Sequence, residues 1–117
     1  MNRWLALVCL AAAFMGCAAG LPAPTSADVA RASQRFPGAT GERLAHGRSL
    51  YVRSCAGCHS LKSPDEVPPA QWAEEIAEMR REHGVQLTDD EASAMAEYLW
   101  AVGTRLREER GQSSASR

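Results

Sequence analysis

Cys55 and Cys58 are separated by two residues, and His59 follows directly. Two thiols at this spacing can each form a thioether bond to a vinyl group of one porphyrin, and the adjacent imidazole can then ligate the iron. The segment Cys55-Ala56-Gly57-Cys58-His59 therefore combines a covalent anchor with a metal ligand. It predicts one covalently attached haem c, with thioether bonds to both cysteines and with His59 as the proximal iron ligand.

Three other interpretations of the motif are a redox dithiol, a zinc site and a chance match. A thioredoxin-like dithiol belongs to a βαβ unit, but no strand-like alternation follows residue 40. A structural zinc site normally has four Cys or His ligands, and the sequence has no second cysteine pair to complete one. The specificity of the motif and its context favour the haem.

Residues 1–16 have the features of an export signal. Asn2 and Arg3 give a short positive region, and an apolar run of about eleven residues follows over 5–15. This run is too short to span a bilayer.

The segment Phe14-Met15-Gly16-Cys17 resembles a bacterial lipobox. This resemblance implies cleavage before Cys17, acylation of its thiol and, because Ala18 follows, sorting to the outer membrane. The alternative is cleavage after Ala19, which would give a soluble periplasmic protein.

The cysteine count agrees with the lipoprotein hypothesis. The sequence has four cysteines, of which Cys9 would leave with the signal and Cys17 would carry lipid. The remaining pair, Cys55 and Cys58, would hold haem, so that no thiol is left for a disulfide.

Composition divides the rest of the chain into three parts. Residues 17–40 are rich in Ala, Pro, Ser, Thr and Gly, which predicts a flexible tether. Residues 41–103 form the expected domain, and 104–117 form a C-terminal tail whose first part, 104–110, can prolong the last helix. A core this small is marginal alone, so we expect a large apolar cofactor to supply buried surface and the apo form to fold poorly.

Three helices are expected in the domain. The first runs over 41–54 with Thr40 as its N-cap, and Gly47 on its inner face would let another helix approach closely. The second begins at Pro69 and ends at Gly84. The third begins with a capping box, and we expect it to end at Gly103. The inner faces read Leu44, Gly47, Tyr51 and Cys55 on the first helix, Trp72, Ile76, Met79 and His83 on the second, and Ala92, Met95, Ala96, Leu99 and Val102 on the third.

These features together resemble the small class I cytochromes c, in a compact haem-domain type found as single-haem carriers and as haem domains joined to periplasmic dehydrogenases. The resemblance covers 41–103 and implies an all-α, three-helix cytochrome c-like domain packed around one haem. It is carried by Gly47, Tyr51, Cys55, Cys58, His59, Trp72, Ile76, Met79, Leu87, Thr88, Glu91, Tyr98 and Leu99.

The sixth iron ligand separates electron transfer from catalysis or gas binding. The resemblance favours Met79 as the distal ligand, with His83 as the alternative, whereas the neighbours of Met95 indicate helix packing. Trp72 is a candidate to contact a haem propionate, or else a core aromatic residue.

Charge and motifs exclude several function classes. The chain has 13 Lys and Arg against 14 Asp and Glu, and this balance does not suggest nucleic acid. The leading hypothesis is a membrane-tethered electron carrier, not an enzyme, that passes single electrons between periplasmic redox proteins. The alternatives are a dedicated electron-accepting subunit of a periplasmic dehydrogenase, and a haem enzyme or gas sensor with an open sixth position and His83 as the distal acid–base residue.

Overall fold

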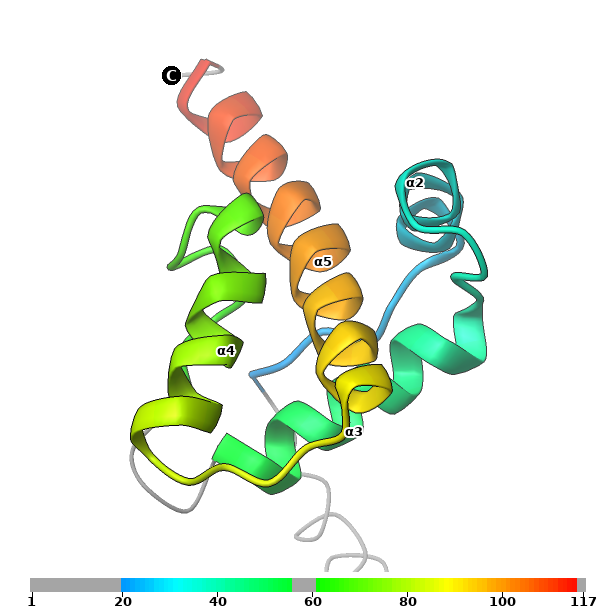
Figure 1. Cartoon of the computed structure of the whole chain (residues 1–117). Helices are drawn as coiled ribbons and strands as arrows, with labels where there is room; N and C mark the ends of the chain where they lie inside the picture. The colour runs from blue at the N-terminus through cyan, green and yellow to red at the C-terminus, as the bar shows by residue number, and fades with distance from the viewer. Residues whose placement is uncertain (1–19, 56–60, 116–117) are drawn as a thin grey trace, which may run out of the picture.

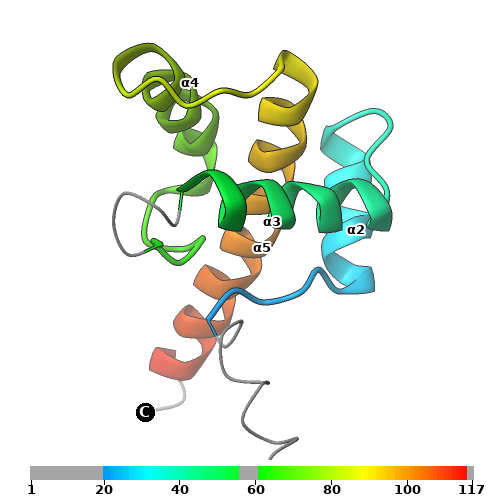
Figure 2. The same ribbon diagram turned by 90° about the horizontal axis from the view of Figure 1, so that it is seen from below.

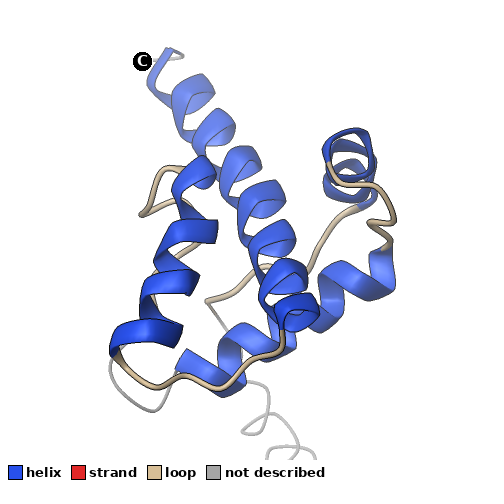
Figure 3. Ribbon diagram, in the orientation of Figure 1, coloured by secondary structure: helices blue, strands red, loops and turns tan. Residues whose placement is uncertain are grey.

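The computed structural model describes residues 20–55 and 61–115, with side chains up to residue 111 in the last helix. The regular elements in these ranges are helices, with no strand, so the prediction of an all-α fold is confirmed for them (Figures 1 and 3). The elements are α2 (Ser26–Arg35), α3 (Gly41–Cys55), the short 3₁₀ turn η2 (Pro69–Gln71), α4 (Trp72–Glu82) and α5 (Asp89–Ala115).

Helix α5 is the centre of the fold. Helix α3 crosses its N-terminal half, while α2 and α4 lie on opposite sides of it (Figures 1 and 2). The core forms where α3 and α5 meet, from Leu44 and Leu50 on one helix and Tyr98, Leu99 and Val102 on the other. No helix in the described ranges is both long enough and apolar enough to cross a membrane.

Local signals in the sequence set the helix ends. The Thr40 hydroxyl accepts a hydrogen bond from the backbone N–H of Arg43 at 3.1 Å, which confirms the predicted N-cap of α3. Thr88 and Glu91 form both bonds of the predicted capping box, at 2.9 and 3.1 Å. Gly84 has a φ of 66°, which lets the chain turn away at the end of α4.

Gly47 brings α3 and α5 into backbone contact, as the sequence predicts. A Cβ atom at this position would lie only 2.1 Å from the carbonyl oxygen of Ala94 in α5. The close packing of α3 against α5 therefore requires glycine, which has no side chain, at this position.

The prediction of a flexible tether over 17–40 is wrong for α2. Thr25 and Asp28 form a capping box at its start, and Asp28 is fully buried. The Nε atom of Arg105 in α5 donates to both carboxylate oxygens of Asp28 at 3.0 Å. The composition of this segment does not predict the helix, because α2 is stabilised by its N-terminal cap and by a buried ion pair with a distant residue.

The chain just before α2 is also fixed to the domain. The guanidinium of Arg48 donates two hydrogen bonds to the carbonyl of Leu21, at 3.0 and 2.7 Å. The hydroxyl of Tyr98 donates to the carbonyl of Pro22 at 2.7 Å. Burial raises the pKa of Tyr98 to about 12, although the nearby positive charges of Arg48 and Arg105 oppose the shift.

We expect the last helix to end at Gly103, and this prediction is wrong because α5 continues to Ala115. A Cβ atom at Gly103 would lie 2.4 Å from the carbonyl oxygen of Pro64. The glycine therefore marks a close approach between α5 and the segment before α4, where we had inferred a helix end. Most of the predicted C-terminal tail, 104–117, is thus part of α5.

Candidate functional site

An apolar cavity lies at the end of α3, where the cysteine motif begins. The space inside it that a water-sized sphere can occupy is about 140 Å³. Helices α3, α4 and α5 supply most of its wall, and two loop segments complete it. The lining residues are Tyr51, Cys55, Leu61, Lys62, Trp72, Glu75, Ile76, Met79, Val85, Leu87 and Met95.

The cavity brings together several residues that the sequence singles out. Cys55, Trp72 and Met79 line it, although they come from two different helices. Met95 lines it as well, so this residue contributes to the cavity in addition to the predicted helix packing.

Cys17, Cys58 and His59 lie outside the described residues. The export signal over 1–16 lies outside them too. The lipidation site, the second thioether and the proximal ligand therefore stay predictions.

Met79 lies near the end of α4 and is partly buried. Its carbonyl accepts hydrogen bonds from the N–H groups of His83 at 3.1 Å and Val85 at 3.3 Å. The positive φ of Gly84 allows the chain to turn back in this way. As a result, Val85 and Leu87 contribute to the cavity wall next to Met79.

His83, the alternative distal ligand, does not reach the cavity. It is the C-cap residue of α4, and its side chain is exposed to solvent. The helical spacing from Met79 suggested a shared face, but α4 ends at Glu82, so this spacing no longer holds at residue 83.

Trp72 joins the cavity wall to the segment that follows the motif. Its indole N–H donates to the carbonyl of Pro64 at 2.8 Å, and this bond is buried. Its ring meets that of Tyr51 edge to face, with centroids 5.8 Å apart. The donor therefore serves the protein backbone instead of the propionate contact that the sequence suggested, and the ring is a core aromatic.

Tyr51 has a role that the sequence did not reveal. Its hydroxyl donates to the carbonyl of Lys62 at 2.8 Å, which ties the chain after the motif to α3. Burial raises the pKa of Tyr51 well above its ordinary value, so the phenol stays protonated and keeps this bond. Only a contact between residues eleven positions apart identifies this function, and no local pattern signals it.

The chemistry of the cavity lining fits an apolar cofactor that is attached through Cys55. Its volume of about 140 Å³ is below the range of about 300–1,000 Å³ that is typical of cofactor and ligand sites, so a haem held here would extend beyond the cavity. Met79 and Met95 offer two thioether sulfurs, which are suitable ligands for haem iron. The charged residues in its lining are Lys62 and Glu75. Among the described residues, no three His, Cys, Asp or Glu side chains form a group that could hold a metal ion.

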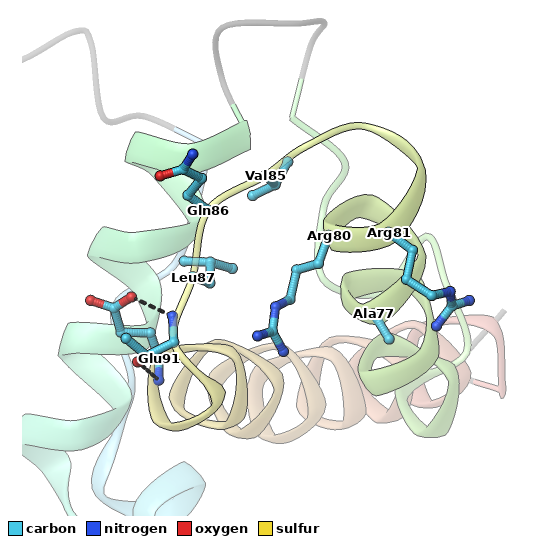
Figure 4. A pocket seen from close by; sticks show the side chains of 8 residues that line it. Ala77, Arg80, Arg81, Val85, Gln86, Leu87 and Glu91 are labelled. Carbon is cyan, nitrogen blue, oxygen red and sulfur yellow. Dashed lines mark hydrogen bonds between the residues drawn. The ribbon is translucent and has the colours of Figure 1, made fainter.

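A second, more open pocket shares Val85 and Leu87 with this cavity (Figure 4). Four of its polar residues, Arg80, Arg81, Thr88 and Glu91, form hydrogen bonds or ion pairs with other residues. Arg80 extends from α4 to pair with Asp89 at 2.9 Å, and Glu91 caps α5 through Thr88. These interactions stabilise the turn between α4 and α5, and we assign no chemistry to the pocket.

The chain matches no family model, no curated protein and no solved structure.

Proposed function

We propose that this protein is an exported c-type cytochrome that passes single electrons between periplasmic redox proteins. One haem c would be attached through Cys55 and Cys58, with His59 as the proximal iron ligand. The observation that carries the proposal is the position of the motif: Cys55 ends α3 at the wall of an apolar cavity that contains two thioether side chains.

The residues of the cavity suit outer-sphere electron transfer. When bound, the haem supplies a one-electron couple between ferrous and ferric iron. The chain's part is to keep water away with Ile76, Val85 and Leu87 and to offer a sulfur from Met79. Ligation by one methionine and one histidine raises the reduction potential relative to ligation by two histidines, and it leaves the iron no free position for a diffusible ligand.

Met79 is the better candidate for the distal ligand. It lies near the end of α4, a short helix next to the loop 83–88, whereas Met95 belongs to the N-terminal part of α5, which packs tightly against α3. The side chain of Met95 is almost fully buried, and its backbone lies against Gly47, where a Cβ atom would be 3.1 Å from its nitrogen.

Visible spectra of the ferric protein test this assignment in wild type, Met79→Ala and the matched control Met95→Ala. A weak far-red sulfur-to-iron band should be present in wild type, lost in Met79→Ala and kept in Met95→Ala. If only Met95→Ala loses the band, the ligand is Met95. If wild type has no band, the sixth position is not held by methionine.

An enzyme or gas sensor receives less support. That hypothesis relied on His83 as the distal acid–base residue, but this side chain is exposed and is not part of the cavity lining. Apart from Cys55 and the hydrogen-bonded indole of Trp72, the polar groups at the cavity are a lysine, a glutamate and a phenol that burial keeps protonated.

We also propose that Cys17 is lipidated and holds the domain at the membrane. Because Leu21 is bonded to Arg48, four residue steps separate the anchor from the fixed part of the chain. Fully extended, they reach about 14 Å. The haem domain would therefore stay close to the membrane surface. Labelling with a radioactive fatty acid in wild type and Cys17→Ala tests the attachment.

A further inference from the structure

The segment 61–66 begins two residues after His59 and leads from the motif towards η2. Two of its backbone carbonyls accept hydrogen bonds from side chains of α3 and α4. The carbonyl of Lys62 accepts a bond from Tyr51, and that of Pro64 accepts one from Trp72, both at 2.8 Å. Pro64 is fully buried against Gly103.

The outer part of the segment forms a tight turn. The N–H of Ser63 donates to the carboxylate of Glu66 at 2.8 Å, and the N–H of Glu66 donates to the carbonyl of Ser63 at 3.0 Å. Asp65 lies at the tip of this turn, and the hydroxyl of Ser63 donates to its carboxylate. The side chain of Asp65 is only 12% exposed.

Two arginines from the C-terminal part of α5 bind Asp65. The Nε atom of Arg107 donates to its carbonyl at 3.1 Å. Arg110 donates to the same carbonyl through Nη2 at 3.4 Å and pairs with the carboxylate through Nε at 3.0 Å. Both arginines are exposed, so their contribution is this contact and not packing in the core.

We propose that Arg107 and Arg110 are positioning residues, which hold the segment 61–66 and through it the haem attachment site. This inference rests on the proposed function. This role explains why α5 continues for about three turns beyond Gly103, past the core of the fold. One side of this extension binds α2 through Arg105, and another side binds the turn at Asp65.

The expected consequence concerns water and charge. Leu61 and Lys62 are part of the cavity wall, so loosening their segment would admit water to the cavity. Ferric haem carries one more positive charge than ferrous haem, and water stabilises the more highly charged state. Removal of the two guanidiniums should therefore lower the reduction potential.

The test compares wild type with the double variant Arg107→Ala/Arg110→Ala, all purified with haem attached. Amide hydrogen exchange in 61–66 should become at least about fivefold faster in the variant, while exchange in α3 is unchanged. The reduction potential should fall. Arg107→Lys/Arg110→Lys should restore part of both properties, since lysine can still donate to Asp65. Arg81→Ala is the matched control, because it removes a similar exposed ion pair, with Glu74 at 3.1 Å, away from this segment.

Unchanged exchange and potential in the haem-loaded double variant would overturn the inference and leave the proposed function intact. Equal changes in Arg81→Ala would also overturn it, because the effect would then come from surface charge alone. A wild-type protein without haem would overturn the proposed function, and this inference with it.

Discussion

Replacing Gly47 by alanine tests the central contact of the fold. The new methyl group would lie 2.1 Å from the carbonyl oxygen of Ala94, whereas real Cβ contacts are essentially never under 3.0 Å. The two helices would therefore have to separate by about 0.9 Å. The obstacle is the backbone of α5, which cannot move aside by a rotamer change. Overpacking of this kind costs about 1–3 kcal/mol or more, and it outweighs the gain of up to about 1 kcal/mol that alanine brings to a helix.

We expect Gly47→Ala to lower the free energy of unfolding by about 2 kcal/mol or more. Gly111→Ala is the matched control, since Gly111 also lies in a helix but a Cβ atom there would meet nothing within 4 Å. That change should leave stability unchanged or raise it by up to about 1 kcal/mol. Urea denaturation followed by circular dichroism measures both variants. If Gly47→Ala is as stable as wild type, the close helix crossing is not a feature of the protein.

Two further predictions concern buried polar groups. Asp28→Ala should lower the free energy of unfolding by about 2–3 kcal/mol and speed hydrogen exchange in α2, because the guanidinium of Arg105 loses its main partner. Asp28→Asn keeps an acceptor and should lose less stability. An unchanged exchange rate in α2 would contradict the role of this ion pair. The contribution of Tyr98 to stability should be fully present below about pH 10, where its phenol is neutral in both the folded and the unfolded protein, and should fall as the pH rises towards the folded pKa of about 12. The urea midpoint should therefore depend less on pH in Tyr98→Phe than in wild type. An equally steep dependence in the variant would show that other groups cause it.

Local signals predicted the parts of the fold that depend on neighbouring residues. The caps at Thr40 and Thr88, the turn at Gly84 and the small residue at Gly47 could each be identified from a few positions. The cavity was partly foreseeable too, because Cys55 and Met79 occupy the inner faces of their helices.

Two of the errors share one physical cause, which is dependence on contacts between distant residues. Helix α2 looked like a tether because a single buried carboxylate, Asp28, fixes it to Arg105, 77 residues away. Gly103 looked like a helix end because the backbone that it accommodates, at Pro64, is remote in sequence. His83 followed the helical period of Met79, but the helix stops before it. This last error has a local cause, because Gly84 already marks the end of α4.

The covalent attachment of haem is the central claim, and the mass of the intact protein tests it most directly. The chain should be produced by export in a bacterium that carries the c-type haem maturation apparatus, beside the variant Cys55→Ser/Cys58→Ser. The account predicts that the wild-type protein is heavier than this variant by one haem, after allowance for the two substituted side chains, because any lipid on Cys17 is common to both. A wild-type protein without this extra mass, or one whose haem is lost on denaturation, would contradict it.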